Sequence, residues 1–327
     1  MPLVSIIVPC YNEEATIRLL LKSIYSQSYP RHEIEVVLAD GMSTDQTRSV
    51  VDAFQQEYPD LLVKVVDNPK RIIPAALNFA LQAAQGEFII RLDGHSMPYS
   101  GYVENCVTDL IQGKGDNVGG VWEIHPAGAN WIARSIAAAA AHPFGVGDAF
   151  YRFTHRAGVV DTVPFGAFRR SLFDQVGKFD ESLLTNEDYE FNTRIRQNGG
   201  VVWLDPAIRS VYFARPDLSA LAKQYWRYGF WKLRMLRRYP GTLRWRQALP
   251  PLFVLSCLGL ALLSILWVTA RWMLVIILIL YFTLLVLGSL PDAYRQKDAR
   301  LLIGIPLAIA TMHFCWGAGF LRSLIDK

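Results

Sequence analysis

Runs of apolar, mostly β-branched residues alternate with amphipathic segments along the first hundred residues. Four short runs are typical of buried strands: residues 4–8, 34–39, 61–66 and 88–92. Apolar residues recur at helical spacing in three segments between these runs: residues 13–27, 43–54 and 75–84. Strands and helices that alternate in this way predict an α/β layer with a mostly parallel sheet.

The pattern changes after residue 217. Residues 218–238 combine apolar positions at helical spacing with Lys and Arg, which predicts an amphipathic helix at a membrane surface. Three apolar runs follow, each about long enough to span a bilayer: residues 252–270, 272–290 and 301–320. We therefore expect three parts: a globular domain (1–217), an interfacial region (218–248) and a transmembrane domain (249–327).

Only Arg271 separates the first two apolar runs, which predicts a tight hairpin. Gly304 and Pro306 weaken the third run, so a kinked or re-entrant helix is an alternative to a full span. Basic residues cluster before the first run and in residues 295–300. The positive-inside rule then places residues 1–248 and 291–300 in the cytosol and the C-terminal tail outside.

Charge divides at the same point as hydropathy. Residues 1–217 hold 19 Lys and Arg against 26 Asp and Glu, a net of −7, whereas residues 218–327 hold 14 against 3, a net of +11. Basic residues that flank apolar runs favour an anionic membrane over nucleic acid as a partner. The four cysteines lie far apart without a CxxC pair, which argues against a disulfide framework or a zinc site. No basic segment precedes the first apolar run, so we expect no signal peptide.

Polar residues follow the predicted strands at the point where each strand ends. Tyr11 and Glu13 follow the first run, Asp40 follows the second, and Asp93 and His95 follow the fourth. Ligands bind beyond the carboxyl ends of strands in open parallel sheets. Each acid alone could be a turn residue or a cap, but their shared position favours a site. Asp93 and His95 could both face one metal ion, and Asp40 could accept a hydrogen bond from a bound base.

Two nucleotide-binding motifs are absent after the first strand: GxGxxG and GxxxxGK. The middle of the chain is less regular. A glycine-rich surface loop is expected at 143–148, a strand at 160–170, and a helix that opens at Glu187 and Asp188. An acid pair at a helix start is also ordinary complementation of the helix dipole.

Three motifs carry a resemblance to a known family: residues 4–13 (VSIIVPCYNE), 39–45 (ADGMSTD) and 91–95 (RLDGH). They resemble the nucleotide-sugar half of glycosyltransferase family 2. Within that family the chain is most similar to the succinoglycan-type, ExoA-like membrane glycosyltransferases of bacterial exopolysaccharide synthesis. The resemblance implies a GT-A fold, a UDP-sugar or similar donor, a divalent metal (Mg²⁺ or Mn²⁺) and inversion at the anomeric carbon.

The resemblance also implies roles for individual residues. It assigns donor binding to Pro9, Tyr11, Glu13, Asp40, Arg71 and Asp93. Asp188 matches the general base that takes a proton from the acceptor hydroxyl, and Glu187 lies beside it on the acceptor side. The usual metal signature is Asp-x-Asp, whereas this chain has Asp93-Gly94-His95. Histidine can ligate Mn²⁺ while Mg²⁺ prefers oxygen, so His95 is either a ligand, which we favour, or a residue that lines the site.

The segment QYWRY at residues 224–228 resembles the family's Gln-x-x-Arg-Trp motif, with Tyr228 in place of Trp. The resemblance places Gln224, Arg227 and Tyr228 near the acceptor and the diphosphate. The alternative is that these residues only anchor a helix at the membrane interface, where aromatic residues are common.

The leading hypothesis is a multi-pass protein of the cytoplasmic membrane with its catalytic domain in the cytosol. It would transfer a sugar to a polyprenyl-diphosphate-linked glycan, with partners in a polysaccharide assembly complex. One alternative is a polyprenyl-phosphate sugar synthase. Another is a non-catalytic scaffold or transport subunit, although the three spans carry few of the polar groups that substrate paths need.

Overall fold

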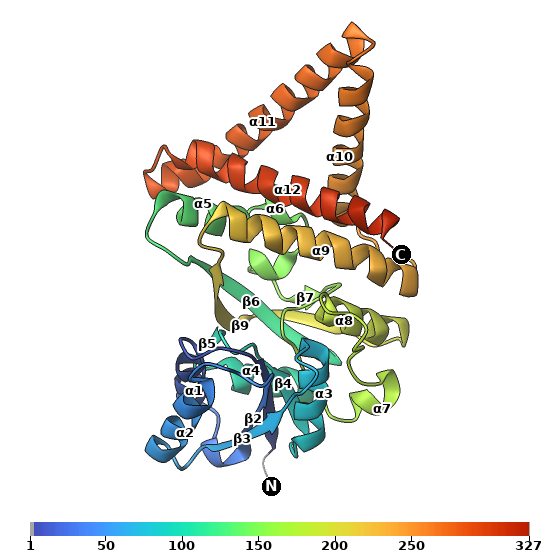
Figure 1. Ribbon diagram of the computed structural model, residues 1–327. Coiled ribbons are helices and arrows are strands. Elements are labelled where there is room, and N and C mark those ends of the chain that lie inside the picture. The colour runs from blue at the N-terminus through green and yellow to red at the C-terminus, as the bar shows by residue number, and fades with distance from the viewer. Residues whose placement is uncertain (1–2, 327) are drawn as a thin grey trace. The chain divides into compact units, whose positions relative to one another are not determined.

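A parallel four-stranded core lies at one end of the central sheet (Figure 1). Strand β1 (Val4–Cys10) pairs in parallel with both β2 (Ile34–Asp40) and β4 (Phe88–Arg91), and β3 (Leu62–Asp67) pairs with β2. Every residue of β1, β2 and β4 is buried, as expected of β-branched strands covered on both faces. The predicted α/β layer with its mostly parallel sheet is therefore confirmed for this part of the chain.

Antiparallel strands extend the sheet beyond β4. They are β5 (Met97–Pro98), β6 (Asn117–Pro126), β7 (Gly158–Val159), β8 (Ala167–Arg169) and β9 (Val202–Ala214). The order is β3-β2-β1-β4-β8-β6-β9-β5, with β7 beside β9. Because β8 runs antiparallel to β4, the residues that precede β8 lie next to the carboxyl end of β4. The strand predicted at 160–170 is present only as its last part, β8.

The structure is a computed structural model that describes residues 3–326, and the chain forms two units in it. The first comprises the chain up to Glu123 together with Thr154–Tyr212, and the second comprises Ile124–Phe153 and the chain from Phe213 onward. The domain limits predicted at residues 217 and 248 stay predictions.

Helices of the first unit cover its sheet. They are α1 (Ile17–Tyr25), the 3₁₀ turn η1 (Arg31–Glu33), α2 (Thr47–Glu57), α3 (Ile73–Ala83), α4 (Tyr102–Ile111), α7 (Leu172–Val176) and α8 (Glu187–Gln197). α3 packs against β1 and β2, and α1 packs against α2. The helix predicted to open at Glu187 is confirmed as α8.

The second unit is helical. It contains α5 (Trp131–Ala141), α6 (Pro143–Val146), the 3₁₀ turn η2 (Phe150–Arg152), α9 (Leu218–Arg238), α10 (Trp245–Leu263), α11 (Val268–Gln296) and α12 (Leu301–Ile325). The helices α10, α11 and α12 are long and apolar enough to cross a membrane. The expected amphipathic helix is present as α9, and α6 corrects the loop predicted at 143–148, because Pro143 starts a short helix there.

The hairpin between α10 and α11 turns earlier than predicted. Residues 264–267 form the turn, and Arg271 lies inside α11. The guanidinium of Arg271 donates a hydrogen bond to the carbonyl oxygen of Ser264 at the end of α10, 3.2 Å away. Basic side chains often satisfy the last carbonyls of a helix in this way, so Arg271 caps α10 from the next helix instead of forming the turn itself.

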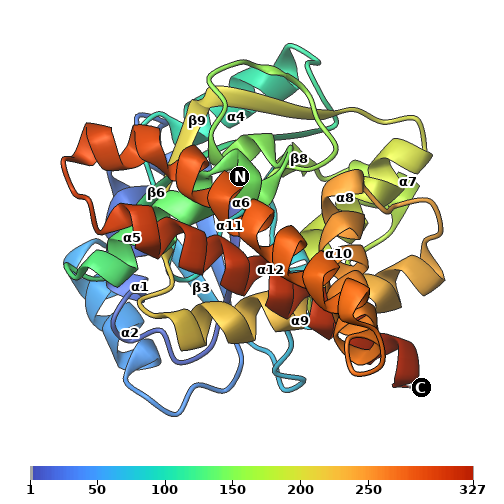
Figure 2. The ribbon, with the colours of Figure 1, turned by 90° about the horizontal axis from the view of Figure 1, so that it is seen from above.

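Glycines allow α9 and α12 to approach each other closely. A Cβ atom on Gly319 of α12 would overlap the carbonyl oxygen of Trp226 on α9, and a Cβ on Gly229 of α9 would overlap the carbonyl oxygen of Trp316 on α12. Figure 2 shows the helices of this unit from above. The two backbones touch, so neither position tolerates a larger residue without moving a helix.

We predict that Gly319→Ala lowers the stability of the detergent-solubilised protein by about 1–3 kcal/mol, the usual cost of overpacking. Gly259→Ala in α10 is the matched control, because nothing lies within 4 Å of a Cβ placed there. That control should be neutral or stabilising by up to about 1 kcal/mol, since alanine favours helices. Thermal unfolding followed by tryptophan fluorescence measures both, and equal melting temperatures for the two variants would contradict the close contact.

Candidate active site

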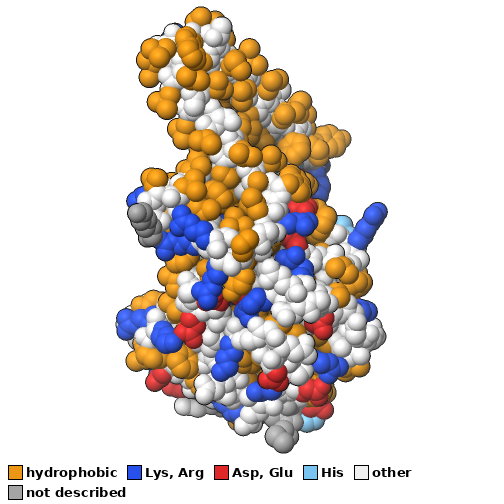
Figure 3. All heavy atoms as spheres, turned by 90° about the vertical axis from the view of Figure 1, so that its right-hand side faces the viewer, with side chains coloured by type: hydrophobic (Ala, Val, Ile, Leu, Met, Phe, Trp, Pro, Cys, Tyr) orange, Lys and Arg blue, Asp and Glu red, His pale blue; other side chains and the backbone are white. Residues whose placement is uncertain are grey.

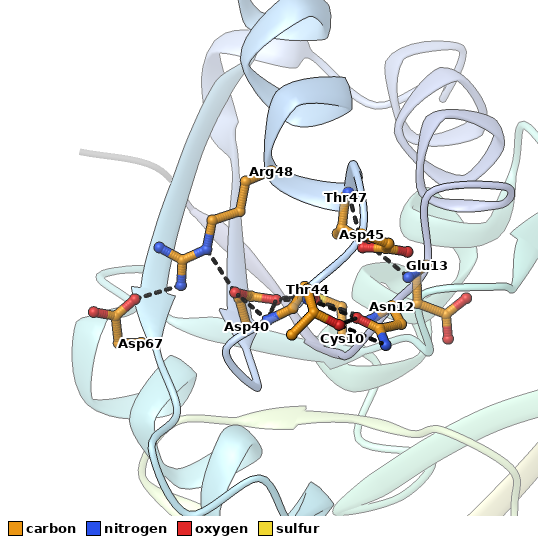
Figure 4. Close-up of polar contacts among 10 residues, drawn as sticks. Cys10, Asn12, Glu13, Asp40, Thr44, Asp45, Thr47, Arg48 and Asp67 are labelled. Carbon is orange, nitrogen blue, oxygen red and sulfur yellow. Dashed lines mark hydrogen bonds and ion pairs between the residues drawn. The ribbon is translucent and has the colours of Figure 1, made fainter.

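The loops that follow β1 and β2 are hydrogen-bonded to each other (Figure 4). The backbone N–H of Asn12 donates to Ser43 Oγ at 2.9 Å, and Asn12 Oδ1 accepts from the N–H of Thr44 at 2.9 Å. The N–H of Glu13 donates to Thr47 Oγ1 at 2.8 Å. These bonds satisfy backbone groups that the ends of the strands leave open, and they hold the two loops as one rigid edge.

The buried carboxylate of Asp40 stabilises the loop after β2. Its side chain is buried and accepts hydrogen bonds from the backbone N–H and the hydroxyl of Ser43 and from Arg48 Nε, the last at 2.6 Å. Arg48 also reaches Asp67 at the end of β3, at 2.5 Å. Burial, reinforced by the Asp40 carboxylate, raises the pKa of the Cys10 thiol to about 12, so this cysteine is a neutral packing group. Asp40 as a contact to a nucleotide base stays a prediction, and Arg48 is the more exposed group beside it.

The backbone at this edge is unusual. Among residues 3–326, six non-glycine residues have a positive φ. Asn12, Met42 and Arg71 are three of them, one in each loop after β1, β2 and β3. Two more, Phe165 and Asn186, directly precede segments that meet the end of β4. Such conformations cost free energy and cluster at functional sites.

Arg91, the last residue of β4, is the centre of the site. Its guanidinium is buried and pairs with Asp93 at 3.0 Å, with Glu187 at 2.9 Å, and with Asp188. Burial alone would lower the pKa of Arg91, but Asp93 and Glu187 outweigh it and hold the pKa above its usual value. The guanidinium is therefore permanently charged and binds the tip of β4 to the first turn of α8.

The three carboxylates differ in exposure. The side chains of Asp93 and Asp188 are 30% and 27% exposed, whereas that of Glu187 is 11% exposed. Glu187 is therefore placed as the inner counter-ion of Arg91, while the other two can also meet a ligand. Both Glu187 and Asp188 lie in the first turn of α8, where the helix dipole stabilises negative charge. Three carboxylates and one guanidinium leave a formal charge of −2.

His95 lies in the turn after Asp93 and contacts the loop after β1. Its Nδ1 is 3.0 Å from Glu13 Oε1. An ionised carboxylate can only accept, so Nδ1 carries the hydrogen and Nε2 is the nitrogen able to bind a metal. Metal-ligating histidines commonly donate their other ring nitrogen to a carboxylate in this way.

The described residues, 3–326, contain no group of three or more His, Cys, Asp or Glu side chains placed to hold a metal ion. Mg²⁺ and similar ions are often held by one or two protein groups plus substrate phosphates. Asp93, which offers Oδ2 beside the oxygen paired with Arg91, and His95 fit that arrangement. The formal charge of −2 on Arg91 and its three carboxylates is also one that a divalent cation would balance.

The remaining predicted residues fall into two groups. Pro9 lies at the end of β1, and Tyr11 and Arg71 are exposed in the loops after β1 and β3. Gln224, Arg227 and Tyr228 are on α9 in the second unit, where Gln224 Nε2 donates to Tyr228 Oη at 2.9 Å. The structure brings these residues together on one helix, and their role towards an acceptor stays a prediction.

Sequence reasoning missed Arg91 as the group that joins Asp93 to Asp188, and Arg48 as the partner of Asp40. A signal for Arg91 was present. A lone arginine ends an otherwise apolar strand, and a buried cation requires carboxylate partners.

Solved structures resemble the chain in fold. The mannosyltransferase PcManGT from Pyrobaculum calidifontis, in complex with GDP-Man and Mn²⁺, matches with a TM-score of 0.69 and 23% identity, over 100% of this chain and 88% of that one. Residues 1–349 of TarS from S. aureus, in complex with UDP-GlcNAc, match with a TM-score of 0.52 and 18% identity, over 95% of this chain and 91% of that one. These likenesses confirm the GT-A-like fold followed by apolar helices.

Sequence comparisons identify the family. Residues 5–177 match the model of Glycosyl transferase family 2. The chain is 30% identical to "Succinoglycan biosynthesis protein ExoA" of Rhizobium meliloti (strain 1021), over 98% of this chain and 94% of that protein. It is 27% identical to "Dolichyl N-acetyl-alpha-D-glucosaminyl phosphate 3-beta-D-2,3-diacetamido-2,3-dideoxy-beta-D-glucuronosyltransferase" of Methanococcus voltae, over 99% of this chain and 98% of that protein. The resemblance carried by the strand-end motifs is thus confirmed, and the chain belongs to glycosyltransferase family 2.

Proposed function

We propose that this chain transfers a sugar from a nucleotide-sugar donor to a lipid-linked acceptor, with inversion at the anomeric carbon, at the cytosolic face of the cytoplasmic membrane. The observation that carries the proposal is the shared ion pairing of Asp93 and Asp188 with Arg91. Two partly exposed carboxylates, 95 positions apart in the sequence, are held on one guanidinium at the edge of the sheet where ligands of such folds bind.

The donor would lie along the loops after β1, β2 and β4. The rigid edge made by Asn12, Ser43 and Thr47 supports its nucleoside part, and Asp93 with His95 faces its diphosphate. A divalent cation, when bound there, would offset the charge that develops on the leaving nucleoside diphosphate. PcManGT, which resembles the chain in fold, has Mn²⁺ in its complex with GDP-Man, and this supports Mn²⁺ or Mg²⁺ as the ion.

Asp188 would act as the general base. Arg91 holds one carboxylate oxygen, Oδ1, which fixes the orientation of the side chain and leaves Oδ2 to accept a proton. As the acceptor oxygen forms its bond to the anomeric carbon, the acceptor proton passes to Asp188, and the bond to the diphosphate breaks with its electron pair. This single displacement inverts the anomeric centre without a covalent intermediate on the enzyme.

The helical second unit supports a lipid-linked acceptor. Three helices in residues 3–326 are apolar enough to span a membrane, and α9 carries six Lys and Arg residues along its length. The name of the Methanococcus voltae relative includes a dolichyl phosphate sugar. An acceptor sugar on a membrane lipid would be presented at the surface where an amphipathic helix such as α9 lies.

We predict that Asp188→Asn reduces sugar transfer by about 10²–10⁴-fold, the usual contribution of a general base. Donor binding should survive, because the amide keeps the size of the side chain. Transfer of radiolabelled sugar to extracted membrane lipids, over a panel of UDP- and GDP-sugars, measures the first effect, and calorimetry measures the second. Asp174→Asn, at an exposed position on α7, is the matched control. Near-normal transfer by Asp188→Asn would show that another group is the base.

Asp93→Ala should weaken UDP or GDP binding in the presence of Mn²⁺ by roughly tenfold or more, the value of a contact to a charged group. The same variant should change affinity little when Mn²⁺ is absent. Titrations with and without MnCl₂ separate the two cases, with Asp52→Ala on the exposed face of α2 as the control. An equal loss with and without Mn²⁺ would argue for a contact that does not involve the metal.

Arg91→Met should destabilise the protein by about 3–5 kcal/mol, because it leaves partly buried carboxylates without a partner. Arg18→Met is the control, since Arg18 pairs with Glu57 at the surface and such pairs contribute about 0–1 kcal/mol. Chemical unfolding of both variants measures the difference. Arg91→Lys should recover part of the stability but less of the transfer rate, because an ammonium cannot hold three carboxylates in a fixed geometry.

A further inference from the structure

The last helix, α12, is long and apolar enough to cross a membrane, yet it lies along α9 (Figure 1). Trp226 and Gly319 are in contact, and further along both helices Arg234 pairs with Asp326 at 3.0 Å. The step between these contacts is eight residues on α9 and seven on α12. Nearly equal steps in the same chain direction mean that the two helices run parallel and side by side.

α9 cannot enter the hydrocarbon core of a bilayer. Six basic residues are distributed over the helix: Lys223, Arg227, Lys232, Arg234, Arg237 and Arg238. Each charged side chain is costly at the centre of a membrane, and a helix of this composition lies at the interface. A helix packed along α9 through backbone contact shares its direction, and therefore lies along the membrane surface as well.

Both ends of α12 are fixed to this layer. Just before α12 begins, the carboxylate of Asp298 accepts a hydrogen bond from Arg134 on α5. Within α12, Gly304 packs against Ser135, which is also on α5. At its end, Arg237 of α9 donates to the carbonyl oxygen of Ser323 at 3.0 Å. A spanning helix would place its two ends on opposite sides of the bilayer. Here Arg134 of α5 binds one end of α12 and Arg237 of α9 binds the other, and neither α5 nor α9 spans a membrane.

Burial separates α12 from the two helices before it. Half of its most apolar stretch is buried inside the protein, compared with 22% for α10 and 11% for α11. Most of the hairpin of α10 and α11 is exposed, and hydrophobic side chains cover it in Figure 3. In Figure 1 these two helices rise away from α12 and meet at residues 264–267, while α12 runs across their base.

We propose that the chain crosses the membrane twice, through α10 and α11, and that α12 lies along the cytosolic membrane surface with its outer face in contact with lipid. That outer face carries Ile303, Leu307 and Leu324, which are apolar and exposed. The C-terminal end then lies on the same side as α9. This replaces the three-span arrangement expected from hydropathy, in which the tail lies outside.

Two single cysteine substitutions test this topology in the full-length protein. Arg322→Cys lies at an exposed, charged position near the end of α12, and Leu266→Cys lies at an exposed position in the hairpin turn. A membrane-impermeant maleimide is added to intact cells and to inverted membrane vesicles, and the labelled peptide is identified by mass spectrometry. The unsubstituted chain gives the background from its own cysteines. We expect label on residue 322 only in inverted vesicles and on residue 266 only in intact cells.

Label on residue 322 in intact cells would overturn the proposal, because α12 would then cross the membrane. Label on residue 266 in inverted vesicles would overturn it as well, because the hairpin would then not cross. Fusions to the C-terminal end of the full-length chain provide a second measurement. Green fluorescent protein should fluoresce there and alkaline phosphatase should be inactive, whereas an active phosphatase would refute a cytosolic end. None of these outcomes depends on which reaction the protein catalyses.

Discussion

The ion pairs of Arg91 with three carboxylates are the interaction on which the site of the first unit depends. A buried guanidinium without partners would be strongly destabilising, and three clustered carboxylates without a cation would repel one another. Each therefore requires the other. The consequence is geometric, because the tip of β4 and the first turn of α8 are fixed together although they are far apart in the chain. Glu187 neutralises Arg91 from the inside, which leaves Asp93 and Asp188 partly exposed and able to take the roles proposed for them.

The same edge is held in place before any ligand binds. Hydrogen bonds between the loops after β1 and β2 hold the backbone there, where Asn12, Met42 and Arg71 adopt positive φ angles that cost free energy. The buried Asp40 does not need a ligand to complete its hydrogen bonds, since Ser43 and Arg48 already supply donors. A site built in this way loses little conformational entropy when a donor binds, and part of its affinity comes from that preorganisation.

Local patterns explain what the sequence could predict. Strands β1 to β4 and helices α1 to α3 and α8 follow from periodicity and caps, which act over a few residues. The strand-end motifs pointed to Asp93, and the family resemblance pointed to Asp188 at the start of a helix. The role of Arg91 depends on partners about a hundred residues away, which periodicity cannot show. The packing of α5 on α12 is hidden for the same reason, since a run of alanines indicates a close neighbour without indicating which one. The early hairpin turn was missed because the apolar run continues through it to Arg271, which acts as a cap.

Hydropathy cannot distinguish a helix that lies along the membrane surface, as we propose for α12, from a spanning helix, and the reason is physical. It measures the free energy of moving side chains out of water, and that quantity is the same whether the new surroundings are lipid or protein. Half of the most apolar stretch of α12 is buried, because the helix packs against α5, α9, α10 and α11, and its glycines allow close backbone contact. The positive-inside rule still applies once this helix is removed from the count of spans. The basic residues of α9 and of residues 295–300 then flank the same hairpin on one side, and no charged segment has to cross the membrane.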